Sequence, residues 1–145
     1  MISALAPQKK SNTSPLPTLQ CSEAEPAATI RTCLELDGAL HKAELRCALG
    51  RPIIVSMYTR GVHLEIGLGL ARSFVSIQRC EPVLGPRVIT IGDVRSHEGA
   101  VFFLLRGDSL EIPGRNLLAS SDARRIFREF FDTGIASTSF YWEAS

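Results

Sequence analysis

Hydrophobic and polar positions alternate along the middle of the chain, and this pattern predicts β-strands. The clearest alternation lies in VHLEIGLGL (62–70), where every second residue is apolar and would face the core. The intervening residues would face the other side of the sheet, and they are His63, Glu65, Gly67 and Gly69. We expect that second face to be bare or covered by something close. PIIVSMYT (52–59) is a second strand, and Arg60-Gly61 suits a hairpin turn between the two.

Shorter runs of strand-forming residues lie on both sides of this hairpin. They predict an edge strand at 27–33 and further strands at 73–80, 86–94, 100–106, 110–113 and 138–144. The run AVFFLLR (100–106) is apolar on both faces, which is typical of a central strand covered on both sides. SHEG (96–99) and RGDS (106–109) are turns. RGDS also matches a short adhesion motif, but Gly and Asp favour turns for conformational reasons alone.

In two segments the apolar residues recur at the period of an α-helix instead of that of a strand. Apolar residues recur at helical spacing in LELDGALHKAELRCAL (34–49). The segment 120–134 presents one broad apolar face, with Ser120 or Ser121 as the N-cap and Gly134 at the stop. The expected fold is α+β, a mostly antiparallel meander sheet packed against an N-terminal and a C-terminal helix. The last strand would re-enter the sheet and complete the core.

The first part of the chain differs in composition from the rest. Residues 1–26 hold four of the eight prolines, with Ser, Thr, Asn, Gln and Lys between them. Such a segment cannot bury enough apolar surface to offset its ordering entropy. We therefore expect residues 1–26 to be a flexible leader and residues 27–145 to form a single domain.

Composition and charge narrow the class of protein. The 145 residues carry a net charge of only +1, which disfavours direct binding of nucleic acid. No apolar run approaches the roughly 18 residues of a membrane span, and the N-terminus lacks the order of a secretory signal. We therefore expect a cytoplasmic protein with no membrane partner. No two of the four cysteines have the spacing of a zinc site, which favours free thiols.

Residues that carry chemistry are few and scattered. The three histidines are far apart and form no metal-binding motif, and the chain has neither a nucleophile elbow nor a phosphate-binding loop. We expect no catalytic residue, no cofactor and no metal, and hence a binding protein rather than an enzyme. Two alternatives stay open. One is a small enzyme that uses Cys80 or His63, and the other is a small-ligand sensor that uses Gly67 and Gly69.

The C-terminal order of elements carries a resemblance. The stretches NLLASSDARRIFREFFDTG (116–134) and FYWE (140–143) give a capped helix with an aromatic pair, a Thr-Gly stop and a strand ending in Trp-Glu. Together with VHLEIGLGLARSFVSI (62–77) and LEIP (110–113), they resemble immunity protein family one of bacterial polymorphic-toxin systems, over residues 27–145. The resemblance implies an α+β cytoplasmic protein that binds and neutralises one cognate toxin, often a nucleic-acid deaminase. Inhibition would be by stoichiometric occlusion, without turnover or cofactor.

Exposed strand and turn residues are the candidates for contact with such a partner. They are His63, Glu65, Arg106, Asp108, Glu111, Tyr141 and Glu143. Because the chain is nearly neutral, we expect shape complementarity with local charge pairs rather than mimicry of nucleic acid. A homodimer is compatible with the sequence.

Overall fold

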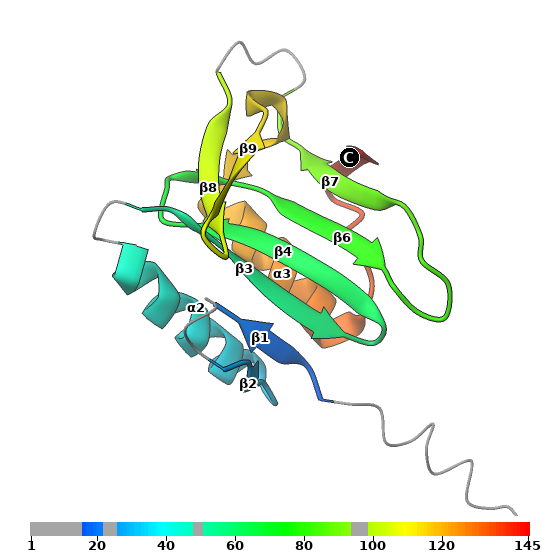
Figure 1. Ribbon diagram of the computed structural model, residues 1–145. Helices are drawn as coiled ribbons and strands as arrows, with labels where there is room; N and C mark the ends of the chain where they lie inside the picture. The colour runs from blue at the N-terminus through cyan, green and yellow to red at the C-terminus, as the bar shows by residue number, and fades with distance from the viewer. Residues whose placement is uncertain (1–15, 22–25, 48–50, 94–98) are drawn as a thin grey trace, which may run out of the picture.

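Two helices cover one face of a mostly antiparallel sheet (Figure 1). The computed structural model describes residues 16–21, 26–47, 51–93 and 99–145. The expected α+β class is confirmed. The helices are α2 (Cys33–Cys47) and α3 (Ser120–Thr133), with a 3-10 turn, η1 (Gly114–Asn116). The strands are β1 (Thr18–Gln20), β2 (Ala28–Thr29), β3 (Ile53–Thr59), β4 (Val62–Leu68), β5 (Arg72–Ser73), β6 (Val75–Arg79), β7 (Arg87–Ile91), β8 (Val101–Leu105), β9 (Asp108–Ile112), β10 (Leu118–Ala119) and β11 (Tyr141–Ala144).

The main sheet has the strand order β11-β7-β6-β4-β3-β1-β2, with every neighbouring pair antiparallel. Strand β8 joins β3 by a parallel contact between Ile53 and Leu104, and β9 pairs with β8. Strands β10 and β5 form a separate pair. Strands β3, β4, β6 and β7 follow one another as in a meander, but β1, β11 and the β8–β9 hairpin enter out of chain order. The sheet is therefore mostly antiparallel without being a simple meander.

The larger core lies between the sheet and the two helices. Val62, Leu64 and Ile66 of β4 are at most 2% exposed and pack in one cluster with apolar residues of both helices. The alternation in β4 thus assigned the core face correctly as far as Leu68. Leu70 lies beyond the end of the strand and is 36% exposed.

Strand β1 corrects the expected boundary of the leader. Thr18–Gln20 lie within residues 1–26, yet they pair with β3, and Leu19 is only 1% exposed. Leu19 joins the core because β1 pairs along the edge of β3 that β4 does not occupy. The expected edge strand at 27–33 is confirmed as β2, which pairs with β1 at the margin of the sheet. Residues 1–15 and 22–25 of the expected leader lie outside the described residues.

Strand β8 differs from the central strand that its sequence predicted. It touches the main sheet at one residue pair, and Phe102 is 56% exposed while its neighbour Phe103 is fully buried. Only one face of β8 is therefore covered. The β8–β9 hairpin turns at Arg106-Gly107, and the β3–β4 hairpin turns at Arg60-Gly61. All four of these residues have positive φ, as the tight turns that match strand twist require. The predicted turn at 96–99 lies almost wholly outside the described residues.

Helix α3 begins without the serine cap that the sequence predicted. Ala119 occupies the N-cap position, and no side chain caps the helix. The reason is a segment distant in sequence, because β10 holds Ala119 against β5 and the Ser120 N–H donates to the Ala71 carbonyl at 2.9 Å. The predicted stop is confirmed. Gly134 has φ 77° and donates its N–H to the Phe130 carbonyl at 2.8 Å.

Candidate functional site

The face of the sheet opposite the helices is largely polar. Directly paired residues on neighbouring strands place their side chains on the same face. One such row crosses the sheet through Gln20, Ser56, Glu65, Ser76, Ile89 and Glu143. The next row runs through Thr18, Tyr58, His63, Gln78 and Arg87. We call these two rows the polar face.

One end of this side of the sheet is covered by the β8–β9 hairpin. The rings of Phe74 and Phe103 meet edge to face with centroids 5.4 Å apart. Phe103 also lies over Gly67, where an added Cβ would approach the ring to 2.5 Å. The expectation of a close cover over β4 is therefore confirmed at Gly67. The glycine-lined surface considered for a ligand sensor is not open there, because the aromatic ring fills it.

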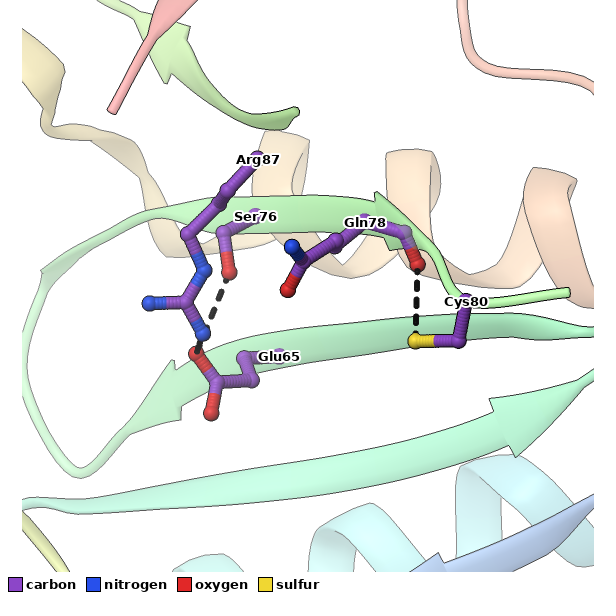
Figure 2. A network of polar contacts seen from close by, with 5 residues as sticks. All are labelled: Glu65, Ser76, Gln78, Cys80 and Arg87. Carbon is purple, nitrogen blue, oxygen red and sulfur yellow. Dashed lines mark hydrogen bonds and ion pairs between the residues drawn. The ribbon is translucent and has the colours of Figure 1, made fainter. Parts of the chain in front are cut away.

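Glu65 is the residue whose environment differs most from expectation. The sequence predicted that Glu65 is an exposed contact residue. The predicted exposure is wrong, because Glu65 is only 2% exposed. Its Oε1 accepts hydrogen bonds from the Arg87 guanidinium at 2.6 Å and from the Ser76 hydroxyl at 3.2 Å (Figure 2). Burial is tolerated because the paired strands β6 and β7 bring a cation and a hydroxyl to the same carboxylate.

Glu143 is anchored at the other end of its row. Its Oε1 accepts from Arg115 at 2.7 Å, and its Oε2 accepts from the Asn116 amide at 2.7 Å. Asn116 is 3% exposed and also donates to the Thr90 carbonyl at 2.9 Å. These bonds tie η1 to the edge of the sheet formed by β7 and β11. Glu143 is therefore half-buried and held in one orientation.

His63 lies half-buried beside these charges. The pKa of His63 is lowered from 6.5, mainly because burial penalises the charged imidazolium. Glu65 opposes this effect, while Arg87 and Arg106 reinforce it. His63 is thus neutral in the folded protein near neutral pH.

A cavity of about 360 Å³ lies between β9 and the polar face. It brings together three of the sequence candidates, Glu65, Glu111 and Glu143, with the arginines Arg87 and Arg115. Its apolar lining comes from Phe74, Ile89, Leu110, Ile112 and Pro113. Candidates that are far apart in the sequence therefore meet at one place.

The remaining candidates do not line this cavity. Arg106 and Asp108 are exposed at the turn of the β8–β9 hairpin. Tyr141 is 80% exposed on the edge strand β11 and lines a separate cavity of about 400 Å³. Its neighbour Trp142 points to the opposite face and packs against the larger core, where its Nε1–H donates to the Ser137 carbonyl at 3.0 Å. The predicted exposure of Tyr141 agrees with this arrangement, whereas Trp142 is partly buried.

A third cavity, of about 530 Å³, lies at the turn between β3 and β4. Here the Tyr58 hydroxyl donates to the Glu81 carboxylate, and this hydrogen bond raises the pKa of Tyr58 to about 12. Cys80, proposed as a nucleophile, donates its thiol to the Gln78 carbonyl at 3.6 Å (Figure 2). In the described part of the chain, no hydrogen bond joins Cys80 to His63.

Several residues of the site were not singled out from the sequence. They are Ser56, Tyr58, Ser76, Gln78, Arg87, Arg115 and Asn116. The signal for most of them is alternation. In IIVSMYT (53–59) and FVSIQ (74–78), serine, tyrosine and glutamine occupy the positions opposite the apolar ones, as His63 and Glu65 do in β4.

Residues 16–21, 26–47, 51–93 and 99–145 contain no group of three or more His, Cys, Asp or Glu side chains placed to hold a metal ion. Neither described helix has the length and apolar character needed to cross a membrane. All four cysteines are free thiols.

The fold and the site define an α+β protein that presents a polar sheet face beside an open cavity. The chain belongs to the Imm1 family, since the family model for immunity protein Imm1 matches residues 24–144. This finding confirms the resemblance seen in the sequence and identifies the chain as an immunity protein. No curated protein matches the chain significantly.

Proposed function

We propose that this protein binds one cognate toxin domain and neutralises it by stoichiometric occlusion. The observation that carries the proposal is the family match over residues 24–144, because the partner of an immunity protein is a toxin. The protein would act in the cytoplasm of the cell that makes the toxin, without turnover and without a cofactor. The partner is a protein, with no direct contact to nucleic acid.

The polar face and the adjoining β8–β9 hairpin are the contact surface in this proposal. They support it because they carry polar and charged side chains on a rigid sheet, with an exposed tyrosine at one edge. Tyrosine and arginine are common anchors of protein interfaces. The contacts would come from His63, Arg106, Asp108, Glu111, Tyr141 and Glu143. Glu65 would act from beneath the surface, because its side chain is buried.

The toxin in this proposal is a nucleic-acid deaminase. Support comes from the family resemblance and from the way in which such an enzyme can be inhibited. A deaminase must take the target base into a pocket, so covering the mouth of that pocket stops the reaction. The net charge of +1 favours local charge pairs over imitation of a polyanion.

The test starts from the reading frame immediately upstream, whose C-terminal domain is expressed in bacteria with and without this protein. The expected result is that growth stops with the domain alone and resumes with co-expression. Co-purification should yield a one-to-one complex. Toxicity without rescue, or an absence of toxicity, would contradict the pairing.

The purified pair then tests the chemistry. Uracil or inosine formation is measured in single-stranded DNA and RNA after addition of the toxin domain. We expect the product to disappear when the two proteins reach equal concentration. Inhibition at far lower inhibitor concentrations would contradict occlusion, and a toxin without deaminase activity would contradict only the assigned chemistry.

A further inference from the structure

We propose that the cavity between β9 and the polar face seats one long basic side chain, an arginine or a lysine, of the toxin. This inference rests on the proposed function and adds the chemical class of the group that is recognised. The volume of about 360 Å³ lies near the lower end for small-molecule sites, which begin at about 300 Å³. A cavity of this size accommodates a side chain rather than a folded segment.

The charges around the cavity do not balance. Three carboxylates and two guanidinium groups line it. Arg87 is paired with Glu65 and Arg115 with Glu143, at 2.6 and 2.7 Å. Within the described residues, Glu111 forms neither an ion pair nor a side-chain hydrogen bond, and it is exposed. One negative charge therefore stays uncompensated at the rim, and a basic group would balance it.

Glu65 offers a second, independent acceptor. Its side chain is 3% exposed, and both of its hydrogen bonds end on Oε1. Figure 2 shows Arg87 and Ser76 converging on that oxygen while the other carboxylate oxygen turns away. No residue of the described ranges donates to Oε2. Oε2 is not among the fully buried polar atoms that lack a partner, but a carboxylate oxygen can accept further hydrogen bonds, and a donor from the partner would supply one.

The apolar lining specifies a long side chain rather than a small cation. Ile89 contributes from the sheet and Phe74 from the position between β5 and β6, and Leu110 and Ile112 contribute from β9. Arginine and lysine bury an aliphatic stem against such surfaces while the charged end reaches an acceptor. Arginine can in addition present several donors in a plane to more than one carboxylate.

The proposed partner is expected to carry such groups. An enzyme that acts on nucleic acid contacts the phosphate backbone with lysine and arginine. A cavity that captures one of these residues would block substrate binding and fix the orientation of the complex. A nearly neutral protein can thus be complementary to a basic surface at one position.

Charge reversal of Glu111 tests the inference, measured on the complex with the toxin domain from the upstream reading frame. We expect Glu111→Lys to weaken binding by at least about tenfold and Glu111→Gln by less, with reduced salt dependence in both. The matched control is Glu129→Lys, which makes the same charge change at an exposed position on α3 and should leave affinity within about twofold. Thermal unfolding of each variant checks that the fold is retained.

A titration of the isolated protein tests the same cavity without the toxin. Nuclear magnetic resonance would follow the backbone amides of Glu111 and Arg115 during addition of N-acetylarginine methylamide. The neutral citrulline analogue is the matched control. Shifts at these amides that saturate with the arginine compound, and not with citrulline, would support the inference.

The outcomes separate the inference from the proposed function. A stable complex whose affinity is unchanged by Glu111→Lys would overturn the cavity as the seat of a basic residue and leave the immunity function in place. Equal shifts with both compounds would overturn it as well. If the wild-type protein forms no complex with the toxin domain, the proposed function fails, and the assignment of the cavity to that toxin fails with it.

Discussion

The carboxylate of Glu65 lies 2.6 Å from the guanidinium of Arg87, on the side of the sheet that faces away from both helices. The two residues come from β4 and β7, which are separated by β6. The Glu65 side chain is 3% exposed and that of Arg87 is 32% exposed. Loss of the ion pair would therefore leave the Glu65 carboxylate without solvent, whereas Arg87 could still be hydrated. This pair is an internal support of the polar face rather than a surface contact.

Replacement of Glu65 should therefore affect folding before it affects binding. We expect Glu65→Gln to lower the free energy of unfolding by about 1–3 kcal/mol, because Arg87 loses its partner and the buried site keeps a polar group. Urea denaturation measures the change. The control Glu111→Gln alters an exposed carboxylate and should stay within about 0.5 kcal/mol. Equal stability of the two variants would show that the ion pair is not structural.

Glu65 also shows what the sequence could and could not predict. Alternation placed it correctly on the face opposite Val62 and Leu64, because the period of a strand is local information. Its burial depends on Arg87 and on the β8–β9 hairpin, which reach it through pairings that no local pattern encodes. The helices and the hairpin turns were predictable for the same reason that β4 was.

The errors share a cause. The pairing of β1 with β3, the exposed face of β8 and the start of α3 are each decided by a neighbour distant in sequence. The proline-rich composition predicted a flexible leader, but three residues of that segment, Thr18–Gln20, pair with an edge of β3. Ser120 was a reasonable cap by propensity, but the pairing of β10 with β5 makes Ala119 the N-cap and places Ser120 inside the helix. The cavity brings together three of the candidate contact residues. The sequence identified each of them separately but could not show that they lie close together.

Gly67 should tolerate no side chain while Phe103 keeps its place. A Cβ at Gly67 would lie 2.5 Å from Phe103 Cε2, and the ring is fully buried. We expect Gly67→Ala to cost about 1–3 kcal/mol of stability. The double variant Gly67→Ala/Phe103→Leu should cost less than the sum of the single changes, as measured by a double-mutant cycle.

The matched control for this change is Gly38→Ala. Gly38 lies in α2, and a Cβ there would meet no atom within 4 Å. We expect this variant to gain up to about 1 kcal/mol, because alanine has the higher helix propensity. Destabilisation by both alanines would indicate that packing at Phe103 is not the reason for the effect at Gly67.

The lowered pKa of His63 predicts a dependence of stability on pH. The unfolded chain takes up a proton near pH 6.5, whereas the folded chain resists protonation at this position. The unfolded state thus binds more protons below pH 6.5, and stability falls as the pH decreases through that value. Above it both states are neutral, and His63 contributes no pH dependence.

Thermal unfolding at about pH 7.5 and about pH 5.5 measures this effect. The decrease in melting temperature on acidification should be smaller for His63→Gln than for the wild type. Glu65, Arg87 and Arg106 are unchanged in this variant, so their contribution cancels in the comparison. An equal decrease in both proteins would rule out His63 as the source.

Neighbouring aromatic residues on β11 should behave in opposite ways. Trp142 packs against the core and donates to the Ser137 carbonyl, so Trp142→Ala should cost about 2–4 kcal/mol. Tyr141 is 80% exposed, and Tyr141→Ala should change stability by less than about 0.5 kcal/mol. Urea denaturation of both variants checks the prediction. A large loss with Tyr141→Ala would contradict the assignment of the two faces.

Asp108 at the turn of the β8–β9 hairpin separates binding from folding. It is exposed on the β8–β9 hairpin, which belongs to the proposed contact surface, so Asp108→Lys should weaken the toxin complex by more than about tenfold while the melting temperature stays unchanged. Calorimetric titration with the toxin domain measures the affinity. The control Asp132→Lys makes the same charge change at an exposed position on α3 and should leave affinity unaltered. If the two variants bind alike, the hairpin turn lies outside the interface, and the contact surface is restricted to the sheet itself.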